Sequence, residues 1–306
     1  MLRGRRIERE AALGEGELPE AKIYVLVDDY ARRRGFIGQH GFSALIELKR
    51  PDGATRVLVD AGQDARVILA NARRLGLDLS QVDAVLITHG HYDHAGGLLE
   101  LLSEVELRNK PVIIHPDALK PKLAFRAGKL VSAGVPGLSE DVIRARGAIP
   151  LVSRGSLKLA DGILTTGEVR RQTDFERVEG FYTVGPGGLV EDPMLDDQGL
   201  VVELPAGLII ITGCAHSGVV NTILHAQELT GREHVLAVVG GFHLEGASQE
   251  VLDRTVEALK RISPEQVLAC HCTGLRAFCR LQSAFGPKFK RLSSGSVISI
   301  KSSLKA

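Results

Sequence analysis

Residues 88–97 contain a dense cluster of the side-chain types that bind metal ions in proteins. They read Thr-His-Gly-His-Tyr-Asp-His-Ala-Gly-Gly, with three histidines and one aspartate within six positions, in a chain that has only ten histidines among 306 residues. The apolar run Ala84–Thr88 leads directly into this stretch and is typical of a short strand covered on both faces. A loop whose histidines only satisfy local hydrogen bonds would not need this density. We therefore predict a metal site at the end of this strand.

The spacing of the four side chains predicts two metal ions rather than one. A tight turn after a strand can aim His89 and His91 at one ion. Asp93 and His94, one turn further on, can reach a second ion at about 3.5–4 Å, the separation used by two-metal hydrolases. Imidazole and carboxylate ligands suit Zn²⁺, and Fe or Mn is tolerated. We expect two Zn²⁺ ions per chain.

The pattern His-x-His-x-Asp-His after an apolar strand resembles the signature of the metallo-β-lactamase superfamily. The resemblance covers about 20–115 and 199–306, and it implies an α/β fold of the αββα sandwich type, with four layers and the metal pair at one edge of the two sheets. Asp60 follows the strand Val57–Val59 and stands where this superfamily carries an aspartate that orients a metal-bound histidine. The alternative is an ordinary turn aspartate.

Cys214 departs from the superfamily pattern. It lies in Gly-Cys-Ala-His-Ser-Gly, directly after the strand Leu208–Thr212, where most members have a bridging aspartate. A cysteine there makes the two sites less equivalent and favours a softer ion. The usual histidine upstream of this strand is also missing, and His216 is the expected substitute. Asp196 or Asp197 is the alternative.

Two further histidines follow strands in the last third of the chain. His271, in Cys-His-Cys-Thr-Gly after Gln266–Cys270, matches the last metal histidine of the superfamily. His243, in Gly-Gly-Phe-His, is expected at the same rim, where it would contact substrate or donate a proton; a metal ligand and an ordinary loop histidine are the alternatives. These motifs and His40-Gly-Phe-Ser resemble the branch labelled dihydropterin-ribofuranosylaminobenzene-phosphate synthase-like, and His40 is a candidate for the pocket wall. We expect His115, His225 and His234 to be structural.

Alternating strands and helices must position these residues. The apolar patterns predict a single domain, 1–306, in which 116–197 is an irregular, proline- and glycine-rich insertion or lid. Strands are predicted at Ala21–Val27, Ser43–Leu48, Arg56–Val59, Ala84–Thr88, Pro111–His115, Leu200–Leu204, Leu208–Thr212, Val235–Val239, Gln266–Cys270 and Ser296–Ile300. Helices are predicted at Gly62–Gly76, Ala95–Glu104, Gly218–Leu229, Ser248–Ile262 and Leu275–Phe285. The order suggests two β/α halves packed face to face.

Composition restricts the compartment and the partners. Thirty-eight Lys and Arg balance 37 Asp and Glu, and a net charge of +1 disfavours a nucleic-acid partner held by a bulk positive field. The charged residues 1–20 lack the apolar core of a signal peptide, and no window approaches the roughly 18 apolar residues of a membrane span. Four cysteines, all after residue 213, are too few for a secreted disulfide framework. We expect a cytoplasmic protein. The sequence does not determine its oligomeric state, and a homo-oligomer is compatible with it.

These residues favour hydrolysis of a small-molecule substrate by a metal-bound hydroxide. Two cations lower the pKa of a bound water to about 7. Asp93 would position that water and accept its proton, and His243 would protonate the leaving group. The branch label implies a phosphorylated ligand, so we favour a promiscuous phosphoesterase acting on small phospho- and other esters. The middle segment contains five cationic residues that could contact an anionic substrate: Arg126, Lys129, Arg154, Arg170 and Arg171. The alternative is that they form an ordinary charged surface exposed to solvent.

Other functions on the same fold remain open. A mononuclear iron oxidoreductase resembling persulfide dioxygenases needs only a subset of these ligands. A lactonase or β-lactamase-type hydrolase would use the same centre on another substrate. A non-catalytic scaffold is disfavoured, because such members usually lose ligands and this chain keeps the cluster. Fold alone does not choose among these.

Overall fold

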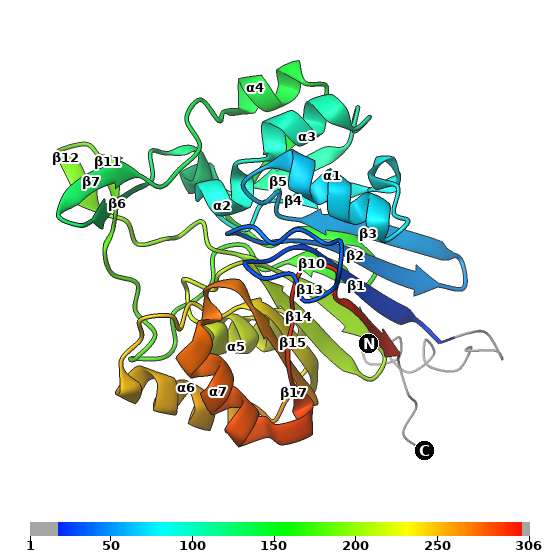
Figure 1. Cartoon of the computed structure of the whole chain (residues 1–306), viewed down its shortest axis with the longest axis vertical. Helices are drawn as coiled ribbons and strands as arrows, with labels where there is room; N and C mark the ends of the chain where they lie inside the picture. Colours follow the sequence, from blue (N-terminus) through cyan, green and yellow to red (C-terminus); the bar gives the residue numbers. More distant parts are fainter. Residues whose placement is uncertain (1–17, 302–306) are drawn as a thin grey trace, which may run out of the picture.

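Two seven-stranded sheets form the body of the protein (Figure 1). The computed structural model describes residues 18–301. Residues 1–17, where we predict no signal peptide, lie outside them, as do 302–306. None of the helices in the described part combines the length and apolar character that a membrane span requires.

The first sheet comes mainly from the N-terminal half, in the order β18-β1-β2-β3-β4-β5-β8. The strands are β1 (Glu20–Val27), β2 (Ser43–Arg50), β3 (Gly53–Val59), β4 (Ala84–Leu86), β5 (Pro111–Ile114), β8 (Ile149–Val152) and β18 (Val297–Lys301). The turn before Gly53 joins β2 and β3 in the predicted hairpin, and β3, β4, β5 and β8 run parallel. Strand β18, the last in the described residues, pairs with β1, so the C-terminal half closes onto the first sheet.

The second sheet has the order β17-β16-β15-β14-β13-β10-β9. Its strands are β9 (Lys158–Ala160), β10 (Ile163–Thr165), β13 (Gly199–Leu204), β14 (Gly207–Thr212), β15 (Val235–Gly241), β16 (Gln266–Cys270) and β17 (Phe289–Arg291). Strands β14 to β17 run parallel, and β13 and β14 form the predicted hairpin. The two halves therefore place parallel strands with their carboxyl ends at one edge of the sandwich.

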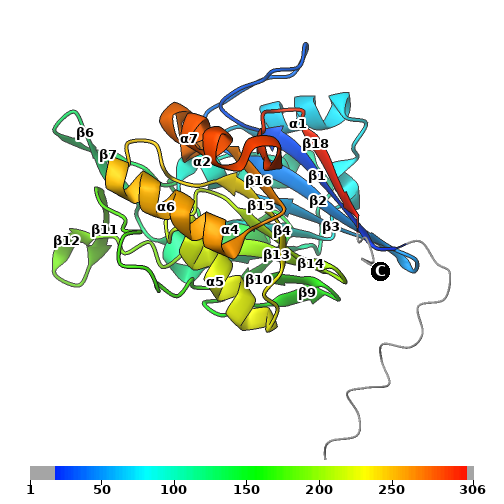
Figure 2. The same ribbon diagram turned by 90° about the horizontal axis from the view of Figure 1, so that it is seen from below.

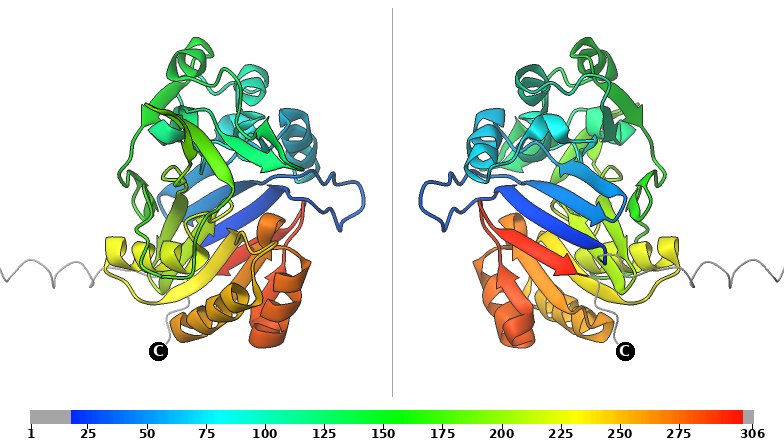
Figure 3. Two further views of the ribbon diagram at one scale, coloured as in Figure 1. Left: turned by 90° about the vertical axis from the view of Figure 1, so that its left-hand side faces the viewer. Right: turned by 90° about the vertical axis from the view of Figure 1, so that its right-hand side faces the viewer.

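Alternating burial shows why the sheets stack. On β14, Ile209 and Ile211 enter the core between the two sheets, whereas Leu208 and Ile210 pack under helices on the outer face. On β2, Ile46 likewise faces the inner core and Leu45 the outer one. Each sheet is thus buried on both faces, and the layers run helix, sheet, sheet, helix (Figures 2 and 3). The αββα sandwich expected from the sequence is confirmed.

Helices cover the outer faces of both sheets. The first sheet carries α1 (Ala65–Arg74), α2 (Tyr92–Ala95), α3 (Leu98–Glu104) and α4 (Glu140–Ala145) on its side, and the second carries α5 (Val219–Thr230), α6 (Gln249–Ile262) and α7 (Leu275–Phe285). Short 3₁₀ turns occur at Leu79–Gln81, Pro116–Leu119, His271–Thr273 and Gly286–Lys288. The single helix predicted at Ala95–Glu104 is instead α2 and α3, which meet at Gly96-Gly97.

The middle segment 116–197 is more ordered than its sequence suggests. It supplies β8, β9 and β10 to the edges of the main sheets, which the sequence patterns missed. Its remaining strands, β6 (Leu123–Arg126), β7 (Lys129–Ser132), β11 (Phe181–Gly185) and β12 (Gly188–Glu191), form a separate four-stranded sheet that projects beside the sandwich (Figure 1). We call this the lid sheet. That the whole segment is a family-specific insertion stays a prediction.

Candidate metal centre

The predicted site residues meet at the edge where the parallel strands of both sheets end. Asp60 follows β3, and the histidine motif follows β4. Cys214 follows β14, His243 follows β15 and His271 follows β16. Segments up to 211 residues apart in sequence, from Asp60 to His271, therefore deliver side chains to one place, because parallel strands present their carboxyl ends at the same edge of a sheet.

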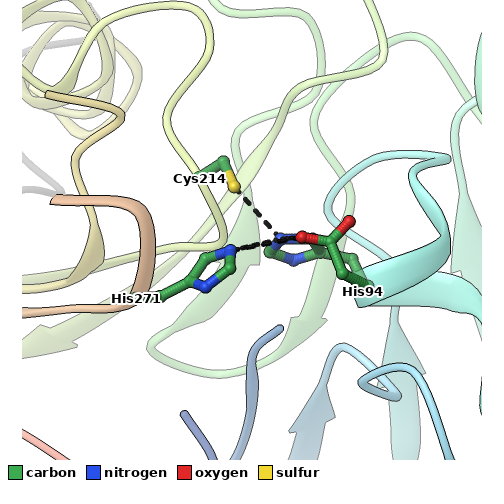
Figure 4. Close-up of side chains that lie close together, drawn as sticks. His94, Cys214 and His271 are labelled. Carbon is green, nitrogen blue, oxygen red and sulfur yellow. Dashed lines mark hydrogen bonds and ion pairs between the residues drawn. The ribbon is translucent and has the colours of Figure 1, made fainter. Parts of the chain in front are cut away.

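One group of donors consists of Asp93, His94, Cys214 and His271, all buried, with one ligand atom from each within 4.8 Å of the others. Nε2 of His94 lies 3.1 Å from Sγ of Cys214 and 3.2 Å from Nε2 of His271. Oδ2 of Asp93 lies 3.4 Å from Nε2 of His271. Figure 4 shows the side chains of His94, Cys214 and His271 pointing toward one another.

The opposite nitrogens of these two histidines determine which atoms are free to bind a metal. Nδ1 of His94 donates to Asp60 and Nδ1 of His271 donates to Asp29, each at 2.7 Å. In the neutral rings, with the proton on Nδ1, each Nε2 carries a lone pair, and two lone pairs that face each other at 3.2 Å repel unless a proton or a metal cation lies between them. Ligand atoms in tetrahedral zinc sites lie about 3.3 Å apart, given Zn–N distances of about 2.0–2.1 Å. The arrangement therefore fits a metal ion.

A second group contains His89, Cys214 and His216, again within 4.8 Å of one another, and Nε2 of His89 lies 3.1 Å from Nδ1 of His91. Burial lowers the pKa of His89 and His216 well below the usual range and that of His91 to about 3. Nε2 of His91 and both ring nitrogens of His216 are buried with no hydrogen-bond partner among residues 18–301. Neutral imidazoles with unused lone pairs fit a second cation.

Cys214 belongs to both groups. Its sulfur therefore stands at the junction where the superfamily resemblance places a bridging aspartate. Burial raises the pKa of this thiol well above its usual value, so the thiolate form requires a nearby positive charge, which a metal ion provides. Asp93, by contrast, is ionised: although burial would raise its pKa, His94 and His271 lower it below the ordinary value.

Strained backbone at the strand ends aims several of these side chains. Asp60, Ala215, His243 and His271 all have φ between 46° and 60°, in the left-handed region that residues other than glycine rarely adopt. Gly41 approaches the motif from the other side, and a Cβ on it would lie 2.2 Å from the Asp93 carbonyl oxygen. Such strain persists only where the surroundings enforce it, which is typical of a functional site.

Asp60, predicted to orient a metal histidine, is fully buried and receives three hydrogen bonds. They come from the Thr88 backbone N–H, the Thr88 hydroxyl and Nδ1 of His94, each at 2.7 Å. Thr88 in turn lies 3.1 Å from Nδ1 of His89. The ends of β3 and β4 are thereby locked together around the two histidines.

Sequence reasoning missed two supporting features, the Asp29 carboxylate and the buried ion pairs of Lys122. Asp29 holds His271 and also lies 3.3 Å from Nδ1 of His40, and its position after an apolar strand was an available signal. Buried Lys122 bonds Asp192 at 2.8 Å and Asp196 at 2.6 Å, and Asp196 accepts the Gly90 N–H between two motif histidines. No local sequence pattern predicts these contacts of Lys122 and Asp196, because the residues involved lie up to 106 positions apart.

The alternative ligands and the remaining histidines lie apart from the donor groups. Asp196 is occupied by Lys122 and Gly90, and Asp197 accepts the Ser217 N–H, so in the described chain His216 rather than either aspartate joins the cluster. The other three histidines have local partners, as expected for structural residues: His115 with Glu168, His225 with the Thr166 carbonyl and His234 with Glu265.

Five of the seven donors, namely His91, Asp93, Cys214, His216 and His271, line a cavity of about 550 Å³. His40, His91, His216, His243 and His271 reach its wall, so His40 and His243 lie at the pocket as the sequence suggested. His243 also sits with Cys214 and Cys272 in a third group of close donor atoms. The lid sheet closes the outer side of the cavity with residues of β6, β7 and β11. The site combines buried side chains of the types that bind metal ions with a cavity of the size of a small-molecule pocket.

Comparison with known proteins gives consistent matches. Residues 38–224 match the family model described as the metallo-beta-lactamase superfamily. The chain is 32% identical, over 92% of its length and 98% of the relative's, to 7,8-dihydropterin-6-methyl-4-(beta-D-ribofuranosyl)-aminobenzene-5'-phosphate synthase of Methanocaldococcus jannaschii.

Solved structures agree with this result. Tm1679, described as a metal-dependent hydrolase of the beta-lactamase superfamily, superposes with a TM-score of 0.76 at 32% identity, covering 92% of this chain and all of that one. Zn²⁺-bound PqqB from Methylobacterium extorquens shares the fold at 15% identity, with a TM-score of 0.53 over 90% of this chain and 99% of that one.

Proposed function

The chain belongs to the metallo-beta-lactamase superfamily and is a metal-dependent hydrolase, and on that premise we propose that it is a broad-specificity phosphoesterase acting on small phospho- and other esters. The observation that carries the proposal is the pair of buried donor groups that share Cys214 at the base of one cavity. The choice of phosphoesters is supported by the relative from Methanocaldococcus jannaschii, whose name includes a 5'-phosphate.

The donor set fits two zinc ions, which suit its imidazole, thiolate and carboxylate groups. Asp93, His94, Cys214 and His271 would hold one. His89, His91 and His216, with Cys214, would hold the other. When bound, such ions lower the pKa of a water and polarise a phosphoryl oxygen.

The protein's own residues supply orientation and proton transfer. Asp60 and Asp29 fix the tautomers of His94 and His271, so that both rings present a lone pair inward. The ionised Asp93 carboxylate accepts a proton from the attacking water, and His243 at the cavity wall donates one to the leaving oxygen. Burial of these groups excludes bulk water and strengthens their interactions with the substrate.

Metal analysis and ester hydrolysis test this function together. We expect about two zinc ions per purified chain and turnover of a phosphodiester such as bis(4-nitrophenyl) phosphate or of a phosphomonoester. His91→Ala should abolish that metal-dependent turnover while the protein stays folded. His234→Ala is the matched control, since that exposed histidine pairs with Glu265 away from the site. One iron per chain without hydrolysis would contradict the proposal and support the iron oxidoreductase.

A synthase-type reaction is the second candidate, because the relative carrying that name matches 92% of this chain. Product analysis in ¹⁸O-labelled water separates the two. A hydrolase places the label in one product, whereas a synthase joins two substrates without incorporating it. Lactone and β-lactam substrates in the same assay separate the remaining hydrolase classes.

A further inference from the structure

We propose that Arg126 and Phe181 of the lid sheet form a subsite for a second, anionic group of the substrate, remote from the bond that is cleaved. This lid subsite would select esters of a flat, aromatic-type alcohol that carries a carboxylate or phosphate at its far end. The inference rests on the proposed function, because it assigns the substrate class of the same site.

The register of the lid sheet determines which side chains face the cavity. Strands β6 and β11 are neighbours, with Phe181 opposite Ala124. Ala124, Arg126 and Phe181 all line the cavity. Phe125, between the first two, instead packs edge-on against Tyr182 on the other face, with ring centroids 5.2 Å apart. Because alternate residues of a strand point to opposite faces, Arg126 is held on the inner face with Phe181.

Phe181 connects the lid to the metal-binding histidines. Its ring centroid lies 4.6 Å from that of His91 and 5.0 Å from that of His216. On the same inner face, the Arg126 guanidinium carbon lies 5.9 Å from the centre of the Phe181 ring. Because His91 and the Arg126 guanidinium already lie against this ring, a planar group would bind beside Phe181, within reach of both the histidines and the guanidinium.

Charge pairing separates Arg126 from Arg154, Arg170 and Arg171, whereas Lys129 differs from it by lying outside the cavity lining. Arg154 and Arg170 form ion pairs with carboxylates, and Arg171 donates to backbone carbonyls. Arg126 has no ion pair anywhere in residues 18–301, and its cross-strand neighbour is a second cation, Lys129. An unpaired guanidinium at a cavity wall is suited to bidentate binding of a carboxylate or phosphate.

The cavity also limits the charge and size of the ligand. Glu179 and Glu245 contribute carboxylates to its wall, and they disfavour a ligand that is negative throughout. A ligand with one localised anion and an uncharged ring can pair with the guanidinium while keeping its negative charge away from the two carboxylates. A volume of about 550 Å³ is far larger than a phosphoryl group needs and accommodates such a ring.

Equilibrium binding of two non-hydrolysable probes tests the subsite without turnover. Calorimetry on the metal-loaded full chain would compare 4-phosphonobenzoate with phenylphosphonate, which differ only in the remote carboxylate. We expect the wild type to bind 4-phosphonobenzoate about tenfold more tightly. Arg126→Ala should bring the affinity ratio close to one, and Arg126→Glu should invert it. Arg170→Ala is the matched control and should keep the wild-type ratio, since Arg170 is exposed and paired with Glu228.

A wild-type ratio near one, or a tenfold ratio that survives in Arg126→Ala or Arg126→Glu, would overturn the proposal. A ratio that also collapses in Arg170→Ala would overturn it too, because the effect would then come from general charge. Failure of the phosphoesterase function is recognised separately, as a metal-loaded enzyme that shows the binding ratio but hydrolyses no phosphoester.

Discussion

Asp60→Asn tests most directly how the sandwich prepares a metal ligand. Asp60 accepts three hydrogen bonds in a fully buried position, and one of them fixes His94 with its proton on Nδ1. An amide has only one acceptor oxygen, so its N–H₂ must face either the Thr88 backbone N–H or the Thr88 hydroxyl together with Nδ1 of His94. In the second case His94 must shift its proton to Nε2, the atom that faces Cys214 and His271.

The expected loss is large enough to measure cleanly. Changes in partners of metal-bound histidines typically reduce metal affinity 10- to 100-fold, or about 1.4–2.8 kcal/mol. The backbone should tolerate the change, because Asp60 has a φ of 60° and asparagine adopts this region as readily as aspartate.

Competition with a chromophoric chelator would give the zinc dissociation constants of the wild type and the variant. Thermal unfolding of the metal-free proteins would separate loss of metal affinity from loss of fold. Asp78→Asn is the matched control, since Asp78 caps the turn Leu79–Gln81 on the surface. Zinc affinity in Asp60→Asn within twofold of the wild type would refute the reasoning that the carboxylate sets the tautomer.

Three further outcomes follow from other contacts. Lys122→Met should leave Asp192 and Asp196 as unpaired buried carboxylates and cost about 3–5 kcal/mol, seen as a fall of about 5–8 °C in the unfolding midpoint; an unchanged midpoint would contradict this. Burial raises the pKa of Glu176 from 4.5 to about 7, so its contribution is complete below about pH 4.5 and is lost as the pH rises through 7. In urea unfolding of the metal-free proteins, Glu176→Gln should therefore gain about 1–3 kcal/mol of stability relative to the wild type between pH 4.5 and pH 8, and a difference between the two proteins that does not change with pH would contradict this. Cobalt-loaded wild type should show thiolate-to-metal absorption in the near ultraviolet that disappears in Cys214→Ser; an unchanged spectrum would exclude the sulfur as a ligand.

Much of the frame could be predicted from the sequence. Apolar runs such as Ala84–Thr88 and Leu208–Thr212 revealed buried strands, because a strand covered on both faces needs apolar side chains at every position. The middle segment was harder to interpret. Its strands β6, β7 and β12 are short and largely exposed, so they lack the burial pattern on which such predictions depend.

The candidate site likewise has one part that the sequence predicts and one part that only the tertiary structure shows. The cluster His89–His94 is recognisable in sequence because its donors are adjacent, and a single strand end positions them all. The sharing of Cys214 by two donor groups, the hold of Asp29 on His271 and the selection of Arg126 from five similar cations were decided only by the tertiary structure. Each depends on distances between segments far apart in the chain, and those distances are set by sheet packing and strand register rather than by local residue types.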